Sequence, residues 1–408
     1  MPLDRLTTAL DAHVAGLDSA GTAKGAEVVV NRVQRASGES GPRFFLEGQE
    51  EKPFIRMNSN SYLGLGLRDD VIEAEEHGSA KYGAGPGAVR FISGTYDVHT
   101  RLEQRLADFH GRESAMAFSS AYATVVSTIV SLVTKDTVLI SDELNHNCII
   151  NAMRLARPAG KGIYGHNDVA GLEKSLQEWV GKAKRAIVVT DGIFSMRGDH
   201  APLKEIQDVC HRFDEHFEEN VVLLVDDSHG VGAFGETGRG TEEYTASGPV
   251  DILIGTLGKA FGVNGGYVTS SESVIRFLRE SSPMYIYSNP ITPGEANACI
   301  RALDVTDSEE GRQLLAHLRA MTQRFEDGLG RIGIETIPGA HPVVPLMIRD
   351  TKKTKAMVRY LFDNGVLATG LAYPVVPQGD EEIRCQVNAD HTPADIDRVL
   401  EILAGFEG

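Results

Sequence analysis

Cysteine and positive charge are both scarce in this chain. Its 408 residues include 40 Lys and Arg against 57 Asp and Glu, which gives a formal net charge of −17. Because a polyanion would be repelled at long range, this balance disfavours nucleic acid or an anionic membrane as a partner. No Cys-x-x-Cys pair occurs, which argues against a zinc site and a disulfide framework and favours reduced thiols. The four cysteines are Cys148, Cys210, Cys299 and Cys385.

Long apolar runs are also missing. The purest one, Val221–Val225, is far too short to cross a bilayer. Asp4, Arg5 and Asp11 fall where a signal peptide would need an unbroken apolar stretch. We therefore expect a cytoplasmic protein that is neither anchored nor exported. A length of 408 residues, with 42% hydrophobic and 24% charged residues, is typical of a globular chain with two domains.

Short apolar runs alternate with helical patterns between about Tyr62 and Tyr267. This alternation predicts an α/β domain with a mostly parallel central sheet and helices on both faces, and ligands beyond the carboxyl ends of its strands. After Pro290 the pattern changes to long helices and shorter strands, which predicts a smaller C-terminal α+β domain. Strands are predicted at 115–118, 137–140, 186–190, 221–226, 252–255, 343–348 and 382–387, with helices at 101–110, 149–155, 172–180 and from Pro393.

These patterns divide the chain into three parts. We predict an N-terminal segment over 1–57, a large cofactor-binding α/β domain over 58–290 and a small domain over 291–408. The first fifty residues mix glycine, alanine and charge with little periodicity. Residues 37–43 and 48–52 are typical of mobile connecting chain.

A lysine and an acidic strand end carry the clearest chemical signal. Lys259 follows Gly258 in a glycine-rich loop, where backbone can approach a planar cofactor. The strand 221–226 ends in Asp226, and His229 comes three residues later. A lysine amine can hold pyridoxal 5′-phosphate (PLP) as a Schiff base, a carboxylate keeps the pyridine nitrogen protonated, and an imidazole can donate to the phenolate. A surface lysine, a capping aspartate and a loop histidine are the alternative, but they leave the crowding at one strand end unexplained.

Two further strand ends offer groups to the same cofactor. His146 follows a predicted strand, where its imidazole could stack on the ring and hydrogen-bond a substrate carbonyl; ordinary helix capping by neighbouring asparagines is the alternative. Ser120, Ala121 and Tyr122 lie between a strand and a helix, where free amides and a hydroxyl favour a phosphate, although serine is also a common N-cap. Thr256 offers a further phosphate hydroxyl.

Two other patterns resemble binding motifs but do not predict a binding site. Gly230–Gly235 matches G-x-G-x-x-G after a strand, but a turn-rich stretch follows where nicotinamide binding requires a long apolar helix. His211 and His216 lie five residues apart on a predicted helix and do not share a face, so no metal site is predicted.

Several motifs in a fixed order resemble the α-oxoamine synthases of the fold-type I PLP enzymes, and most closely their glycine C-acetyltransferase branch. The resemblance runs from about Asn58 to the C-terminus. The motifs are Asn-Ser-Tyr-Leu-Gly-Leu at 60–65, Val-Arg-Phe-Ile-Ser-Gly-Thr at 89–95, Ile-Ser-Asp at 140–142 with Leu-Asn-His at 144–146, Phe-Ser-Met at 194–196, Asp-Asp-Ser-His at 226–229, Gly-Thr-Leu-Gly-Lys at 255–259, Thr-Gly at 369–370, Tyr-Pro-Val-Val-Pro at 373–377 and Ile-Arg at 383–384.

The resemblance implies a role for each matching residue. Lys259 would carry the cofactor, Asp226 would meet its pyridine nitrogen and His229 its phenolate, while His146 would stack on the ring. Arg384 would bind the substrate carboxylate, which a guanidinium fork can hold with two hydrogen bonds.

The same resemblance implies a substrate pocket and a partner. Asn60 and Ser195 would line the pocket. Ser288 and Asn289 would reach the phosphate of a neighbouring subunit, which implies a homodimer with shared active sites. Two residues depart from the family pattern at the pocket: Arg197 stands where the family usually has an acidic residue, and Val125 where it often has asparagine. The glycine loop after Lys259 is also one residue shorter than in the acetyltransferases.

The activity implied is that of a PLP-dependent acyltransferase. Our leading hypothesis is condensation of a small amino acid, glycine first, with an acyl-coenzyme A thioester, which releases coenzyme A and allows a later decarboxylation. The alternative is an enzyme similar to 8-amino-7-oxononanoate synthase or a secondary-metabolite enzyme, with alanine or another amino acid and a longer acyl thioester. A transaminase and a non-catalytic partner subunit are further alternatives.

Overall fold

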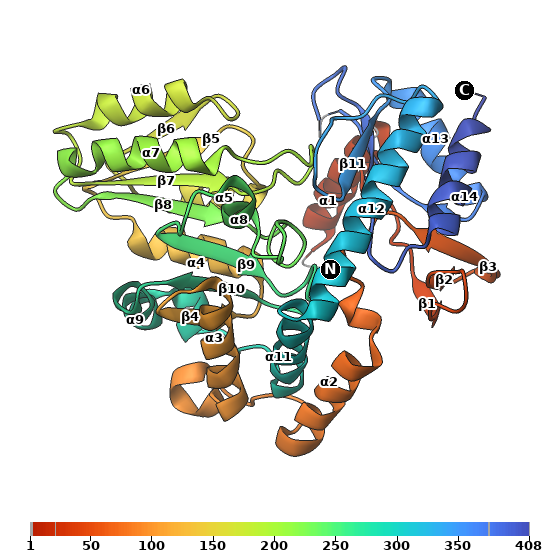
Figure 1. Cartoon of the computed structure of the whole chain (residues 1–408). Coiled ribbons are helices and arrows are strands. Elements are labelled where there is room, and N and C mark those ends of the chain that lie inside the picture. The colour runs from red at the N-terminus through yellow and green to blue at the C-terminus, as the bar shows by residue number, and fades with distance from the viewer. Residues whose placement is uncertain (1–2, 21, 374–375, 408) are drawn as a thin grey trace.

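The computed structural model describes residues 3–20, 22–373 and 376–407. Pro374 and Val375, which belong to the motif at 373–377, lie outside the described residues. Figure 1 shows a broad α/β body beside a smaller domain, with the long helix α12 (Glu309–Arg331) running between them. The predicted fold class and the smaller C-terminal domain are confirmed, while the boundaries after residues 57 and 290 stay a prediction.

A mostly parallel sheet forms the centre of the large domain. Within the described ranges it has seven strands in the order β4-β10-β9-β8-β7-β5-β6. Neighbours from β9 to β6 pair in parallel, whereas β10 is antiparallel to both β4 and β9. The strands are β4 (Ser114–Phe118), β5 (Thr137–Asp142), β6 (Gly160–Tyr164), β7 (Arg185–Asp191), β8 (Val221–Asp226), β9 (Ile252–Thr256) and β10 (Gly266–Ser270).

Alternate side chains along these strands face two different layers of helices. Leu139 and Leu224 pack in the cluster that includes α4, α5 and α9, whereas Val138 and Leu223 pack in the cluster with α6 and α7. Figure 1 shows α6 and α7 on one face and α4 on the other. Both faces are therefore buried, as a parallel sheet with crossover helices requires. The helices are α4 (Ala121–Leu132), α5 (Asn147–Leu155), α6 (Val169–Trp179), α7 (Leu203–Phe213) and α9 (Glu272–Ser281).

The N-terminal segment is more ordered than its sequence predicts. Residues 48–52, read as connecting chain, instead enter strand β3, and Phe44, Phe54 and Leu367 form a small core of their own. β1 is exposed along its whole length and β3 does not alternate between buried and exposed residues, so neither has the period of two that would predict a strand. The segment contains α1 (Asp4–Ser19), β1 (Val30–Gln34), β2 (Arg43–Leu46) and β3 (Gln49–Arg56), in a sheet of order β1-β2-β3-β12 with β12 (Val366–Leu367).

The small domain brings one further strand to the site. Strand β14 (Glu382–Gln386), which carries Arg384, pairs with β11 (Val343–Met347) and β13 (Thr369–Leu371). Helices α13 (Thr351–Asp363) and α14 (Pro393–Ala404) complete this domain. Among the helices described, none has the length and apolar content that a membrane crossing requires. The remaining elements are η1 (Leu65–Leu67), α2 (Asp69–Tyr82), η2 (Arg90–Gly94), α3 (Asp97–His110), η3 (Asp214–His216), α8 (Thr241–Thr245), α10 (Pro283–Ile286) and α11 (Pro293–Thr306).

Candidate active site

A cavity lies where the carboxyl ends of β5, β7 and β8 meet the loop after β9. It gathers residues that the sequence predicted from five separate motifs, together with three that it did not. The predicted residues on its lining are Ala121, Tyr122, His146, Ser195, Asp226, His229 and Lys259, and the others are Cys148, Asp191 and Ser228.

Lys259 lies in a tight loop between the antiparallel neighbours β9 and β10. The loop closes with a hydrogen bond from the Gly262 amide to the Lys259 carbonyl (2.9 Å). Gly262 has φ of +72° and lies against the backbone of Gly66, so a side chain there would meet the chain itself. Glycine is therefore required at this position because two chain segments approach each other closely there, and not because a cofactor does. Shielding from water lowers the pKa of Lys259 to about 8, although the charge of Asp226 opposes the shift.

Two carboxylates lie next to each other at the ends of β7 and β8. Asp191 and Asp226 are paired across the two strands, and both side chains are buried. Asp226 accepts a hydrogen bond from the Ser228 amide (3.1 Å) and a long one from the Cys148 thiol (3.6 Å). Burial and then the charge of Asp226 raise the pKa of Asp191 well above its usual value. Two neighbouring buried carboxyl groups therefore favour the protonated form of Asp191.

The geometry of His146 defines which of its ring nitrogens carries hydrogen. Its Nδ1 accepts from the Cys148 amide (3.2 Å), so that a neutral ring has its hydrogen on Nε2. Shielding from water lowers the pKa of this histidine, which favours the neutral ring. The Asp191 carboxylate accepts from the His146 amide (2.8 Å) and so fixes the start of α5.

A chain of hydrogen bonds links His229 to the small domain. The hydroxyl of Tyr62, which is fully buried, lies 2.7 Å from Nδ1 of His229 and 3.3 Å from Oδ1 of Asn60. The same Asn60 oxygen accepts from Nη2 of Arg384 (3.1 Å). Burial lowers the pKa of His229 well below its usual value. The Tyr62 hydroxyl has one hydrogen, which it can donate either to Asn60 or to Nδ1 of His229; when it goes to His229, a neutral ring presents its N–H donor on Nε2.

Arg384 has donors left for a ligand. Its Nε is buried and has no hydrogen-bond partner among the described residues. A buried donor without a partner is costly, and a carboxylate from a substrate would satisfy it. Burial also lowers the pKa of this guanidinium.

Four of the predicted cofactor ligands do not line the cavity. The Ser120 hydroxyl caps α4 by accepting from the Ala123 amide (3.2 Å), and the Thr256 hydroxyl donates to the Gly265 carbonyl (3.3 Å). Ser288 and Asn289 follow α10 at the surface, and the Ser288 hydroxyl contacts only the next carbonyl among the described residues.

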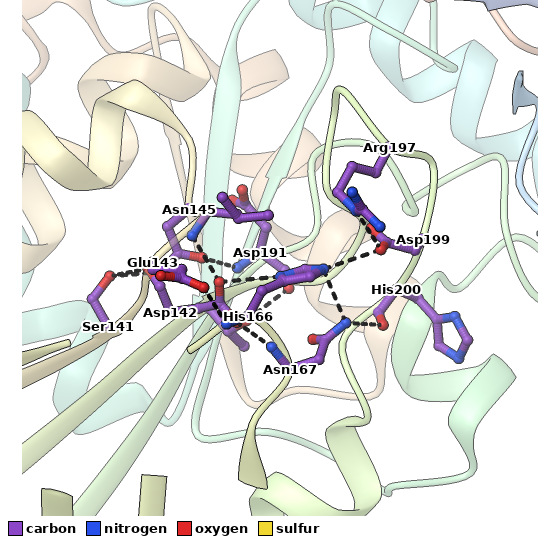
Figure 2. Close-up of polar contacts among 12 residues, drawn as sticks. Ser141, Asp142, Glu143, Asn145, His166, Asn167, Asp191, Arg197, Asp199 and His200 are labelled. Carbon is purple, nitrogen blue, oxygen red and sulfur yellow. Dashed lines mark hydrogen bonds and ion pairs between the residues drawn. The ribbon is translucent and has the colours of Figure 1, made fainter. Parts of the chain in front are cut away.

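The two departures from the family pattern have different surroundings. Val125 is buried among the apolar residues around α4. Arg197 follows Ser195 in the loop after β7, and its Nε donates to Asp199 (2.9 Å), as Figure 2 shows. Ser195 itself lies on the cavity lining.

The lining fits PLP. The cavity joins an amine, a carboxylate and two imidazoles, and the N-terminus of α4 turns the amides of Ala121 and Tyr122 toward it. The buried Ser228 hydroxyl has no partner among the described residues, so a further polar group can be bound there. Lys259 would hold the aldehyde and Asp226 the pyridine nitrogen.

Comparisons with known proteins define the family. Residues 52–403 match the family model for aminotransferase class I and II. The 8-amino-7-oxononanoate synthase 1 of Bacillus velezensis is 37% identical over 366 residues, which are 90% of each chain. The 8-amino-7-oxononanoate synthase of Marinobacter nauticus is 39% identical over 370 residues, again 90% of each. Serine palmitoyltransferase from S. paucimobilis, solved with bound PLP, superposes with a TM-score of 0.86 at 26% identity over 99% of this chain and 96% of that one.

The chain belongs to the α-oxoamine synthases. This synthase is a PLP-dependent C-acyltransferase of fold type I, as the motifs indicated. The branch differs from our leading expectation, because these relatives carry the name of 8-amino-7-oxononanoate synthase rather than glycine C-acetyltransferase. The comparisons therefore support the alternative function better than the glycine hypothesis.

Three residues that contact the predicted site residues of this synthase were not predicted from the sequence. Asp191 lies one position beyond the predicted strand 186–190. An acidic residue at the end of an apolar strand is the pattern from which it could have been predicted. Cys148 was read only as one of four scattered thiols, yet its backbone amide and its thiol contact His146 and Asp226. Tyr62 falls in the motif at 60–65, but no local pattern indicates its contact with His229, which is far away in the sequence.

Proposed function

We propose that this α-oxoamine synthase condenses a small amino acid, alanine in first place, with a long-chain acyl thioester, in the manner of 8-amino-7-oxononanoate synthase. The bond formed joins the α-carbon of the amino acid to the acyl carbon, the C–S bond breaks, and the thiol leaves. Loss of the amino-acid carboxylate as CO₂ would complete the reaction. The relatives at 37% and 39% identity, which cover 90% of this chain, support this choice over glycine with a short acyl group.

One observation supports the chemistry: Lys259, Asp226, His146 and His229 line one cavity. Arg384 is connected to this site by hydrogen bonds through Asn60 and Tyr62. PLP, when bound, supplies an electron sink that makes the α-proton of an amino acid acidic. We assign Lys259 as the residue that would hold the cofactor, and its free Nζ would remove the α-proton of the substrate. Its pKa of about 8 suits this role, since part of the lysine is uncharged near neutral pH.

The remaining residues orient the reactants. Arg384 would hold the substrate carboxylate, so that the α-C–H bond stands in line for Lys259. The Nε2–H of His146 would hydrogen-bond the thioester carbonyl and stabilise the charge that develops on its oxygen. The Asp226 carboxyl group would accept a hydrogen bond from the pyridine nitrogen, and His229 would donate from Nε2 to the phenolate.

We also propose that the active form is a homodimer. Ser288 and Asn289 lie outside this chain's own cavity, which is consistent with donation to a neighbouring site. The preceding residue, Tyr287, is 79% exposed, and Phe91 and Ile92 of the adjoining η2 segment are 67% and 68% exposed. Exposed apolar groups of this size favour burial against another chain.

A substrate matrix tests the function. Purified protein loaded with PLP is given glycine, alanine or serine with acetyl-, octanoyl- or pimeloyl-coenzyme A, and the released thiol is measured. We expect kcat/KM to be highest for alanine with a long acyl group, by roughly tenfold or more over glycine with acetyl-coenzyme A. Lys259→Ala is the control that should release no thiol. A preference for glycine and acetyl-coenzyme A would contradict the proposal, and amino transfer to a keto acid without thioester would indicate a transaminase.

A further inference from the structure

His166 joins two segments that border the cavity. It follows the edge strand β6, and its ring lies between two carboxylates (Figure 2). Nδ1 is 3.3 Å from Oδ1 of Asp142, and Nε2 is 3.0 Å from Oδ2 of Asp199. The ring also meets the edge of Phe194, with 4.4 Å between the ring centres.

Each ring nitrogen faces a carboxylate oxygen, and Nε2 also has the Nδ2 of Asn167 at the longer distance of 3.3 Å. A neutral imidazole has one N–H donor, so only the protonated ring can donate to Asp142 and Asp199 together. Burial lowers the pKa of His166, but the two hydrogen bonds and charges outweigh it and raise the pKa to about 9. The other charged groups at this point are Arg197, whose Nε donates to Asp199, and Glu143, which accepts from the His166 amide.

The two carboxylates belong to two segments that each supply a residue to the cavity lining, His146 from one and Ser195 from the other. Asp142 ends β5 and accepts from the Leu144 amide (2.8 Å), two residues before His146. Asp199 belongs to the 193–200 loop, which carries Ser195. Within this loop the Phe194 and Gly198 amides bond to other loop residues, so the loop holds its own shape. Asn167 adds a second tie, from its side chain to the His200 carbonyl (3.2 Å).

We propose that His166 is a positioning residue, whose cationic ring ties the 193–200 loop to the segment before α5 and so holds Ser195 and His146 in place on the cavity lining. This inference deepens the proposed function, because it concerns the same cavity. His166 itself does not line that cavity. Its contribution is therefore to the geometry of the two side chains that do.

Protection of the loop from trypsin reports this tie directly. Arg197 offers a cleavage site inside the loop, and cleavage requires the loop to open. His166→Gln keeps a donor for one carboxylate but loses the charge and the second bond. We expect cleavage after Arg197, followed by mass spectrometry on the PLP-loaded protein, to become faster on the order of tenfold. His211→Gln, at an exposed position on α7, is the matched control and should leave the rate unchanged; equal rates for the two variants would overturn the proposal.

The wild-type protein provides a second test that needs no variant. The pKa of His166 is raised from 6.5 to about 9, so the tie is strongest below pH 6.5, weakens as the pH rises and is lost above about 9. The rate of cleavage after Arg197, divided by that of an unstructured peptide at the same pH, should therefore rise between pH 6.5 and 9 and then level off. His166→Gln should show no such rise, and a flat wild-type profile would overturn the proposal even if the variant failed to fold.

Kinetics separate this inference from the proposed function. With the best substrate pair, His166→Gln should raise the KM of the amino acid several-fold and change kcat less. A normal KM in a variant whose loop is cleaved faster would overturn the inference that His166 positions Ser195 and His146. The protease measurements use no substrate. A chain that condenses no thioester but shows pH-dependent protection would contradict the function alone.

Discussion

Replacing Lys259 by methionine should stabilise the cofactor-free protein. The lysine is shielded from water at the cavity, and its pKa falls from 10.5 to about 8. Folding therefore penalises the charged amine, and the full shift corresponds to about 3 kcal/mol. Because the side chain remains partly open to solvent, we expect Lys259→Met to gain ~2 kcal/mol at pH 7.

The sign of this effect follows from the direction of the shift. A lowered lysine pKa penalises the fold in full below about pH 8, less as the pH rises, and not at all above 10.5. Urea unfolding of the cofactor-free proteins, followed by circular dichroism, should give a large gap at pH 7 and a small one at pH 10. Lys174→Met, at an exposed position on α6, should behave like wild type at both values. A Lys259→Met variant that is less stable at pH 7, or a gap that persists at pH 10, would refute the reasoning.

Three other substitutions test the polar groups around the cavity. Tyr62→Phe removes the hydroxyl beside His229, and because a buried group left unpaired costs ~1–3 kcal/mol, PLP affinity in equilibrium dialysis should fall about tenfold; unchanged affinity would count against the tautomer argument. Arg384→Lys keeps the charge but loses the fork, so the amino-acid KM should rise on the order of 100-fold, and an effect confined to kcat would speak against carboxylate binding. Asp226→Asn should still bind PLP, which the visible absorbance of the cofactor would report, but its kcat should fall about 10²-fold or more. A near-normal kcat would contradict the role assigned to Asp226.

The parallel core of the fold was predictable because its strands are continuous apolar runs. β8 matches its predicted range, Val221–Asp226, and β9 extends the prediction by one residue. The edge strand β6 was missed because its glycines and exposed residues interrupt any apolar run. β10 was missed because it lies in the glycine-rich stretch after the lysine. An unbroken apolar run was therefore the legible signal, as edge strand β4 with its run Ala115–Phe118 also shows, whereas β6 and β10 have no such run.

The candidate site divides along similar lines. That Asp226, His229 and Lys259 lie together could be predicted, because groups that end apolar strands meet at one edge of a parallel sheet. The tie between Tyr62 and His229 joins residues far apart in the chain, and no local pattern encodes that contact. The three-dimensional arrangement was required to identify it.

The amine and the guanidinium of this site belong to different structural layers. Lys259 follows a strand of the large sheet, whereas Arg384 lies on β14 of the small one. An amino acid bound by its amine at the large domain and by its carboxylate at Arg384 would link the two domains. An amine without a carboxylate would bind only to the large domain. Ligand carboxylates should therefore damp the relative motion of the domains, and this rigidity would be absent with decarboxylated analogues of the same size.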